Sequence, residues 1–407
     1  MLEQILIGMM DLQGYCMEKA ELRDDGLHLW LRREKQEFVC PQCGDRAFGT
    51  HSHWEVTLRE RPILGRPTWL HLPQYRVRCA CRNQPVTVAL PVKEEGFRVT
   101  HWLAVAVVEA AREVPVKFVA RLFGMSWNTV RDIDLTYLRR KIETRERVAP
   151  NAIGVDEVSY QAGHKYLTIV TDPGRRRILH VVFGRRAENF KEFFENRMDP
   201  MACKWLEAAC TDMWDPYVTT IRKYAPQAVL VYDPFHVSTH LHRAVDLVRS
   251  AEQTKLTHEG KTFLKRKRFL LLRGQEKLDP EQQQTLQQIL QQNQNLHTAY
   301  LLKEQFRQLY DLDREDGESP QALYRRAFQF LVGWMRRALD SRLQPFRHFV
   351  NQLKRRWQGV LNYYRYPLTN GLSEGLNNKI ASLKKRAYGY RNLEYFTLKI
   401  YQQGGFL

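Results

Sequence analysis

The sequence lacks a long hydrophobic run. No apolar stretch among its 407 residues reaches the roughly eighteen residues that a membrane-spanning helix needs. The nearest candidate, around Trp102–Ala111, is short and contains Glu109. The first residues, MLEQILIGMM, carry an acid at position 3 and have neither the basic start nor the cleavage site of a signal peptide. We therefore expect a cytoplasmic protein without a membrane partner.

Cysteine is scarce, and acidic residues are in deficit. Seven cysteines, an odd number in a chain without a secretion signal, argue against a disulfide framework. Lys and Arg number 63 against 45 acids, which gives a formal net charge of +18. This excess fits a polyanionic partner, because each phosphate that a protein neutralises releases condensed counterions. Hydrophobic residues make up 43% of the chain, so a mostly disordered protein is excluded and the length suffices for two or three domains.

Four of the seven cysteines fall within 42 residues. Cys40 and Cys43 belong to a CPQCG turn, whose backbone amides can point at the sulfurs, and Cys79 and Cys81 follow a segment of period-2 alternation. Four thiolates on facing hairpins would bind a structural Zn²⁺ tetrahedrally. Because the second pair is CxC instead of CxxC, a histidine could replace one thiol, and buried reduced cysteines are the other alternative. The candidate histidines are His51, His53 and His71.

Residues 100–141 change to helical periodicity. His101–Glu113 has a broad apolar face, and Pro115 suits the first position of a second helix. After a turn at Gly124, Ser126 can cap a third helix. Two helices joined by a short glycine turn are typical of a DNA-binding helix-turn-helix, with plain helix packing as the alternative. The reading end of the last helix would carry Trp127, Asn128, Thr129 and Arg131.

From about residue 150, strand and helix patterns alternate. Three strands connected as a meander come first, and a helix, a strand, a helix and a strand follow. This is the order of an α/β ribonuclease H-like fold. The strands are predicted at Ala152–Asp156, Tyr166–Val170, Ile178–Phe183, Leu206–Cys210 and Ala228–Tyr232, and the helices at Asn189–Met198 and Pro216–Tyr224.

Two carboxylates should converge in this fold, because Asp156 on the first strand and Asp212 at the end of the fourth lie on neighbouring strands. Buried acids lose hydration and repel each other, and a divalent metal relieves both problems. Glu374, in the first turn of a late helix, would be the third acid, with Asn377 and Asn378 near the same face. Three carboxylates fit two Mg²⁺, with Mn²⁺ as a substitute, for phosphodiester chemistry. Taken singly, the acids have ordinary alternatives as a strand-end acid, a helix cap and half of a capping box. Two further acids, Glu157 and Asp215, are expected to be a neighbour on the opposite strand face and a helix starter.

The interval between Asp233 and Glu374 is helical in pattern and longer than the fold needs, which predicts a mostly α-helical insertion. Two basic stretches accompany it, one of Lys261 and residues 265–268 and one over residues 351–391, where nine Lys or Arg stand against a single acid. The second stretch also carries aromatic rings able to stack on unpaired bases. We expect DNA contacts from Lys265, Arg266, Lys267, Arg268, Lys384, Lys385 and Arg386.

The chain carries a series of motifs, which in order are CPQCG (40–44) with the later CxC, the helix-turn-helix, GVDE (154–157), TDMWDPY (211–217), YDPFHV (232–237) and TNGLSEGLNNKI (369–380). Together these motifs resemble the ISL-three family of bacterial insertion-sequence transposases. The likeness covers nearly the whole chain, although the second cysteine pair departs from CxxC. It implies an Asp-Asp-Glu triad of Asp156, Asp212 and Glu374, and a DxxH motif of Asp233 and His236 near the active site. A core histidine satisfied by Asp233 is the alternative for that pair.

The resemblance implies a DNA transposase. Such an enzyme binds the terminal inverted repeats of its element, hydrolyses phosphodiesters at the ends and joins the 3′-hydroxyl ends to target DNA. It further implies a homodimer on double-stranded DNA, without a small-molecule substrate, at the bacterial nucleoid. The alternatives are a structure-selective nuclease on the same fold and a zinc and helix-turn-helix regulator without catalysis. The expected domains are a β-rich zinc-binding module (1–95), the helix-turn-helix (96–147), a first catalytic part (148–248), a helical insertion (249–360) and a last catalytic part (361–407).

Overall fold

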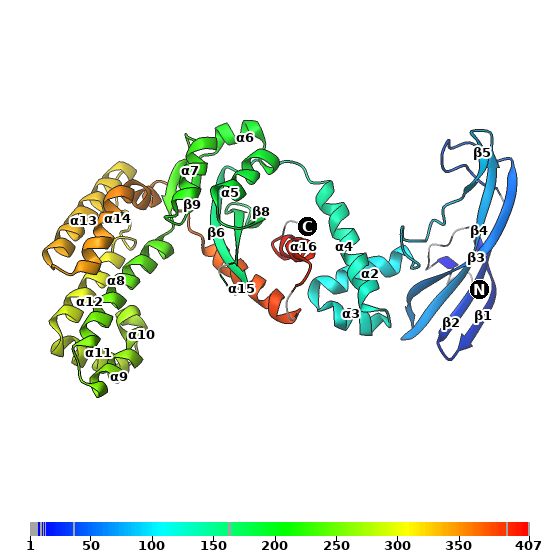
Figure 1. Ribbon diagram of the computed structural model, residues 1–407. Coiled ribbons are helices and arrows are strands. Elements are labelled where there is room, and N and C mark those ends of the chain that lie inside the picture. Colours follow the sequence, from blue (N-terminus) through cyan, green and yellow to red (C-terminus); the bar gives the residue numbers. More distant parts are fainter. Residues whose placement is uncertain are drawn as a thin grey trace. The chain divides into compact units, whose positions relative to one another are not determined.

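The computed structural model describes residues 7–8, 10, 12, 14–35, 37–161, 163, 165–387 and 390–405, without the side chains of residues 372–374. Contacts divide the chain into two compact units. The first unit holds the chain up to Arg145 together with Ser382–Gln403, and the second holds Glu146–Ala381 together with Gly404. Figure 1 labels the elements of both units. Among the residues described, no helix has the length and apolarity needed to cross a bilayer.

The first unit begins with a five-stranded sheet (Figure 1). Hairpins make the pairs β1–β2, β3–β4 and β4–β5 antiparallel, whereas β2 and β4 pair in parallel. Gly26, which begins β2, has a φ of 141°, and a Cβ there would lie 2.1 Å from the carbonyl oxygen of Pro67. Glycine is therefore required where the chain passes this close to β4. The strands are β1 (Tyr15–Arg23), β2 (Gly26–Arg33), β3 (Gly49–Ile63), β4 (Arg66–Cys79) and β5 (Arg82–Thr87).

Three helices follow and form the expected helix-turn-helix. The hydroxyl of Ser126 caps the last helix by accepting a hydrogen bond from the backbone amide of Thr129 at 3.0 Å. Gly124 ends the middle helix in the left-handed conformation, at a φ of 60°, which keeps the turn short. The middle helix begins one residue later than predicted, because Pro115 occupies its cap position. The helices are α2 (His101–Glu113), α3 (Val116–Phe123) and α4 (Trp127–Glu143).

A buried polar cluster fastens α16 (Leu393–Gln403) to α4 within this unit. The ammonium of Lys399, which is 2% exposed, donates to Asp134 Oδ2 at 3.1 Å and to the carbonyl oxygen of Ala111 at 2.7 Å. The hydroxyl of Tyr395 donates to the same oxygen of Asp134 at 2.5 Å. Burial lowers the pKa of Lys399, and the charge of Asp134 opposes that shift. Each of the two charges therefore depends on the other for compensation.

The second unit is built on a mixed sheet with the strand order β10-β9-β6-β7-β8. β6, β7 and β8 form an antiparallel meander, and β9 and β10 run parallel to β6. Every predicted strand is present. β6 continues past its predicted end at Asp156, because residues as far as Gln161 still pair with β7. The strands are β6 (Ala152–Gln161), β7 (Lys165–Asp172), β8 (Arg177–Phe183), β9 (Ala208–Thr211) and β10 (Val229–Tyr232).

Helices between the strands pack on this sheet. The helix predicted at Asn189–Met198 consists of two pieces, a short α-helix and a π-helical turn. Phe190, Phe193 and Phe194 nevertheless share the buried face that the sequence predicts. The helical elements are α5 (Ala187–Glu192), η1 (Phe193–Arg197), α6 (Pro200–Trp205) and α7 (Asp215–Tyr224).

The expected helical insertion follows β10, and its hydrophobic core also includes Met213, Val218 and Tyr232 of the sheet part. Phe306, Trp334 and Phe346 are fully buried in that core, and the rings of Phe306 and Trp334 lie 4.8 Å apart. The glutamine-rich run forms α11, with Leu286 and Ile289 buried on one face. The elements are α8 (Pro234–Thr254), α9 (His258–Arg266), α10 (Arg268–Leu272), η2 (Gln275–Lys277), α11 (Pro280–Gln292), α12 (Gln294–Arg307), α13 (Pro320–Asp340), α14 (Gln344–Leu361) and η3 (Asn362–Tyr364), before α15 (Gly371–Arg386).

We expect Asp134→Ala to destabilise the packing of α16, because it leaves the ammonium of Lys399 buried without its counter-charge. Breaking such a pair costs about 3 kcal/mol, which corresponds to amide exchange in α16 on the order of a hundredfold faster. Hydrogen-exchange mass spectrometry of residues 393–403 measures this locally. The matched control is Asp132→Ala, which removes a partly exposed carboxylate paired with Arg131 and should change exchange little. Unchanged exchange in Asp134→Ala would contradict the role given to the cluster.

Candidate functional site

Three aspartates lie where neighbouring parallel strands come together. β6 and β9 pair through Gly154 and Cys210, each two residues before an acid, so the register places Asp156 beside Asp212. β10 pairs with β9 up to the residue directly before Asp233. The sheet therefore brings the carboxylates of three strands to one edge.

These carboxylates are largely removed from solvent. Asp156 is 7% exposed, Asp233 is 2% exposed and Asp212 is partly buried. Burial raises the pKa of both Asp212 and Asp233, the negative charge of Asp156 adds to the shift, and His236 opposes it. A positive charge bound between the acids would relieve both the desolvation and the repulsion.

His236, in the first turn of α8, contacts this group. Its Nε2 atom lies 3.4 Å from Asp156 Oδ1 and 3.8 Å from Asp233 Oδ2. Burial lowers the pKa of His236, but the hydrogen bond and charge of Asp156, with the charges of Asp233 and Asp212, raise it overall. The side chain is 29% exposed and its nearer acid is Asp156, so it is not a core histidine satisfied by Asp233 alone.

Helix α15 packs its first turns beside the same strands. Asn377 donates its amide to Asp156 Oδ2 at 3.2 Å, and Asn370, directly before the helix, donates to the carbonyl oxygen of Val155 at 3.0 Å. The backbone of Glu374 lies in this helix one turn before Asn377, and its side chain is outside the described residues. Asn378 is exposed.

The donor atoms at this edge suit a hard cation. Besides the carboxylates, the side-chain oxygens of Asn370 and Asn377 are buried and accept no hydrogen bond within the described part of the chain. Carboxylate and amide oxygens are the ligands that Mg²⁺ takes in proteins. The donor types therefore suit a divalent metal, whereas among the described residues no three of these carboxylates and His236 have ligand atoms all within 4.8 Å of one another.

The predicted alternative for Asp212, a cap of the helix Pro216–Tyr224, is not what the structure shows. α7 begins at Asp215, its cap position is Trp214, and no side chain of the described residues caps it. Asp212 instead accepts a hydrogen bond from the backbone amide of Trp214 at 3.0 Å, which orients the carboxylate.

A second layer of polar groups was missed by the sequence analysis. Tyr217 donates its hydroxyl to Glu157 at 3.2 Å and is 2.7 Å from the hydroxyl of Thr168. Burial is the largest cause that raises the pKa of Glu157, and the next is the charge of Asp212. Glu157 is therefore electrostatically part of the site, although it is on the opposite strand face from Asp156. Its presence in GVDE and that of Tyr217 in TDMWDPY were the available signals.

Arg185 and two rings form a further feature beside Asp212. The guanidinium lies 4.7 Å from the ring of Tyr166 and 4.9 Å from that of Trp214, and it is 3.7 Å from the carboxylate of Glu157. The indole of Trp214 donates to the backbone oxygen of Arg185 at 3.1 Å. A cation held between aromatic faces can contact a phosphate or a base.

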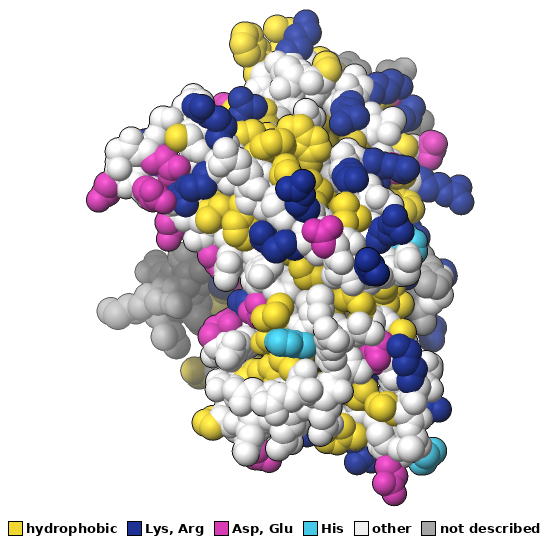
Figure 2. Space-filling model, turned by 90° about the vertical axis from the view of Figure 1, so that its left-hand side faces the viewer, with side chains coloured by type: hydrophobic (Ala, Val, Ile, Leu, Met, Phe, Trp, Pro, Cys, Tyr) yellow, Lys and Arg dark blue, Asp and Glu magenta, His cyan; other side chains and the backbone are white. Residues whose placement is uncertain are grey.

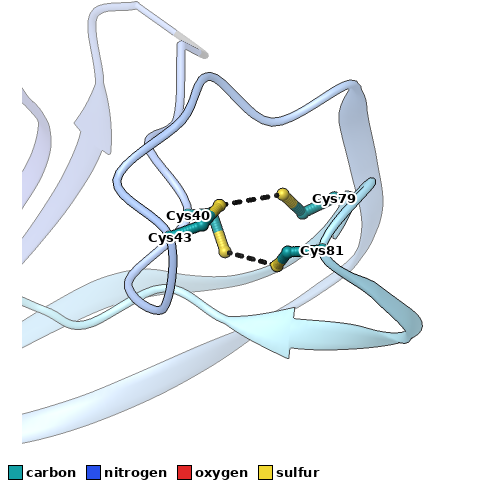
Figure 3. Close-up of side chains that lie close together, drawn as sticks. All are labelled: Cys40, Cys43, Cys79 and Cys81. Carbon is teal, nitrogen blue, oxygen red and sulfur yellow. Dashed lines mark hydrogen bonds between the residues drawn. The ribbon is translucent and has the colours of Figure 1, made fainter.

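The four cysteines of the first unit come together in a separate cluster. The sulfurs of Cys40 and Cys81 are 3.6 Å apart, those of Cys43 and Cys79 are 3.4 Å apart, and all four lie within 4.8 Å of one another (Figure 3). Around a tetrahedral zinc with bonds of about 2.3 Å, sulfurs are about 3.8 Å apart, so the cluster fits the metal. Among the described residues it is the only group of three or more such ligands this close together. The candidate histidines have other neighbours: His51 contacts Ser52, His53 packs on Tyr75, and His71 pairs with Glu55.

The thiols of this cluster have strongly altered acidity. Backbone amides of Cys43 and Gln42 donate to the sulfur of Cys40 and lower its pKa to about 6, as the CPQCG turn predicts. Hydrogen bonding by Cys79 and the other nearby sulfurs raises the pKa of Cys81 to about 12. Four sulfurs this close cannot all ionise without a cation between them.

The helix-turn-helix residues that are predicted to contact DNA differ in their exposure and in their contacts within the protein. Trp127 and Asn128 are exposed at the start of α4. Thr129 contacts the hydroxyl of Ser126 at 2.8 Å, and Arg131 pairs with Asp132 at 2.6 Å while lying 5.0 Å from the ring of Trp127. Trp127 and Asn128 are therefore the better available to a ligand.

The predicted basic residues also differ. Lys265 and Arg266 are exposed on α9, whereas Arg268 pairs with Asp246 at 3.1 Å. Lys267 lies 5.9 Å from the ring of Phe263, Lys384 and Lys385 lie in the last turn of α15, and Arg386 donates to the backbone oxygen of Glu113. Figure 2 shows a face on which Lys and Arg side chains are interspersed with hydrophobic ones.

Three family models match the chain in the order of its domains. A zinc-finger of transposases IS204, IS1001, IS1096 and IS1165 matches residues 36–81, which include all four clustered cysteines. The helix-turn-helix domain of transposase family ISL3 matches residues 88–138. The transposase model of the same family, of the DDE type, matches residues 153–400.

Curated relatives agree along nearly the full length. The transposase for insertion sequence element IS1001 of Bordetella parapertussis is 34% identical over 394 residues, 95% of each chain. The transposases for insertion sequence element IS1557 of two Mycobacterium tuberculosis strains, CDC 1551 and H37Rv, are each 27% identical over 408 residues, 90% of this chain and 86% of theirs. The chain therefore belongs to the ISL3 family of DDE transposases.

Proposed function

We propose that this transposase cuts and joins DNA on a ribonuclease H-like fold, with Asp156, Asp212 and Glu374 as the catalytic acids. The observation that carries the proposal is the convergence of acids at one edge of three parallel strands, beside the helix that holds Glu374. The strand order, with an antiparallel meander and two added parallel strands, is the one that a ribonuclease H-like fold requires.

The same three acids would bind two Mg²⁺, for which Mn²⁺ is a substitute. Metals held by these acids would supply stabilisation of the negative charge that develops in an in-line displacement. Asn377 donates to one oxygen of Asp156 and His236 contacts the other, so the carboxylate is held in one orientation. We further propose Asp233, His236, Asn377 and Asn378 as accessory residues of the site, and the contacts of His236 and Asn377 with Asp156 support two of them.

The proposed reaction has two displacements at phosphorus. In the first, a water oxygen attacks the phosphodiester at the element end, the bond to the 3′-oxygen breaks, and a 3′-hydroxyl and a 5′-phosphate result. In the second, that 3′-hydroxyl attacks a phosphodiester of target DNA, whose own 3′-oxygen leaves. Neither displacement needs a covalent bond between protein and DNA, so no Ser or Tyr nucleophile is assigned.

Binding of the terminal repeats is proposed for the zinc-binding module and the helix-turn-helix. A structural Zn²⁺ held by Cys40, Cys43, Cys79 and Cys81 would stabilise the module. Trp127 and Asn128 would contact base edges, and Lys265, Arg266, Lys267, Lys384 and Lys385 would contact phosphates. A homodimer acting on paired ends at the nucleoid, and the five-part division into residues 1–95, 96–147, 148–248, 249–360 and 361–407, belong to the same proposal.

We expect Asp156→Asn, Asp212→Asn and Glu374→Gln each to reduce cleavage at least about a thousandfold, because each removes a ligand charge that stabilises the transition state. The measurement uses purified protein, Mg²⁺ and labelled DNA carrying the element ends, and it counts nicks at the end boundary and joined products. Gel-shift affinity for the same DNA should stay within a few-fold of the unaltered protein.

The matched control is Asp215→Asn, three residues from Asp212 in the same motif. Its carboxylate is 77% exposed and pairs with Arg356 at 2.7 Å, so cleavage should be retained. Cleavage without joining would favour a structure-selective nuclease. Specific binding without cleavage under Mg²⁺ and Mn²⁺ would favour a regulator and contradict the catalytic assignment.

We expect Cys81→Ser to lose bound zinc, because three thiolates hold the metal more weakly than four. Inductively coupled plasma mass spectrometry should find about one zinc per unaltered chain and clearly less in the variant. Cys16→Ser alters a cysteine of β1 outside the cluster and should keep the full content. Equal zinc in Cys81→Ser and the unaltered protein would remove Cys81 from the ligand set.

A further inference from the structure

A cavity of about 910 Å³ lies wholly within the first compact unit. α3 and the start of α4 line one side, and residues between Leu383 and Lys399 line the other. Its volume is at the upper end of the range for ligand-binding cavities, so it admits a group as large as a nucleotide.

The wall of this cavity is aromatic. Phe118 and Trp127 contribute from the helix-turn-helix, and Tyr390 and Tyr395 contribute from the end of the chain. Phe118 and Trp127 are 44% and 48% exposed, which is unusual for large apolar rings and leaves part of each ring accessible to a ligand.

The charge of the lining has one sign. Of the described residues that line the cavity, seven are Lys or Arg and none is Asp or Glu. Arg131 and Lys399 are neutralised by Asp132 and Asp134. Lys117, Arg121 and Arg391 are exposed and form no ion pair within the described part of the chain, so an anionic occupant would meet uncompensated cations.

The position of the cavity connects it to DNA. Trp127 and Arg131 belong to the first two turns of α4, the helix that a helix-turn-helix inserts into a groove. Arg121 lies 5.2 Å from the ring of Phe118 and Arg131 lies 5.0 Å from that of Trp127, so cations already flank the rings. Flat rings beside cations are the environment in which proteins hold a base that has left its stack.

We propose that this cavity receives one unstacked nucleotide of the bound DNA, with its base against Phe118 and Trp127 and its phosphate toward Lys117, Arg121 and Arg391. The proposal rests on duplex binding by the helix-turn-helix, as proposed above. A protein segment as occupant would have to be strongly acidic, whereas a nucleotide supplies both the flat ring and the negative charge.

The test is a mismatch scan with the full-length protein. Labelled duplexes carrying the element end are made with a single mismatched pair at successive positions, and equilibrium affinities are compared with that of the matched duplex. A mismatched base is already unpaired, so less free energy is needed to move it out of the stack. At the position that enters the cavity, a mismatch should therefore raise the affinity on the order of tenfold. Phe118→Ala should abolish this preference, because it removes a stacking face.

Leu122→Ala is the matched control, because it shortens an exposed apolar side chain of the same helix, 56% exposed, that does not line the cavity. It should keep the preference. Matched-duplex binding with no position of higher affinity, or a preference that survives Phe118→Ala, would overturn the proposal and leave duplex binding intact. Failure to bind any duplex would instead refute the proposed binding of element ends.

Discussion

The second unit depends on one constraint, which is the placement of three aspartates, Asp156, Asp212 and Asp233, at one edge of three parallel strands. Repulsion between the acids opposes this arrangement, and surrounding elements compensate for it. Asn370 ties the start of α15 to Val155 of β6, and its backbone amide donates to the carboxylate of Asp233. The insertion returns to the same edge: a Cβ at Gly359 of α14 would lie 2.5 Å from the ring of Tyr232, and Asn362 donates to the carbonyl oxygen of Leu230. A long helical insertion is therefore compatible with the site, because it leaves β10 and returns to it.

The sequence was informative about this unit where one periodicity dominates. Short apolar runs located all five strands, and three phenylalanines located one buried helix face, although that helix is interrupted by a π-helical turn. The part that could not be predicted depends on contacts across strands. The charge of Asp212 raises the pKa of Glu157 because β6 and β9 pair in a particular register. The alternation of residues along one strand carries no information about that register. The partner of His236 was ambiguous for the same reason, since Asp156 lies eighty positions earlier in the chain.

Net charge predicts a polyanionic partner but not which cations would meet it. Lys399 forms a buried ion pair with Asp134, Arg268 pairs with Asp246, and Arg386 donates a hydrogen bond to a backbone oxygen. The same holds for rings of the second basic stretch: Trp357 packs on Phe328 and Tyr363 packs on Tyr310, while Tyr388 lies outside the described residues. Counting basic and aromatic residues therefore overstates the surface available to DNA, and only ion-pairing and burial separate structural cations from those open to a phosphate.

The carboxylate cluster and the cysteine cluster both bring negative charges close together, and they do so with different donor atoms. At the sheet edge the donors are carboxylate and amide oxygens, which favour a hard cation that keeps open positions for water and phosphate oxygens. In the first unit the donors are four sulfurs, which favour a borderline-soft ion with tetrahedral coordination and occupy all four of its positions. In a chain that has both clusters, the ligand atoms alone would direct a hard metal to one cluster and zinc to the other. Because four thiolates leave no open position, phosphodiester chemistry would belong to the oxygen site, as proposed above, and the sulfur site would act on DNA only by fixing the hairpins around Cys40 and Cys79.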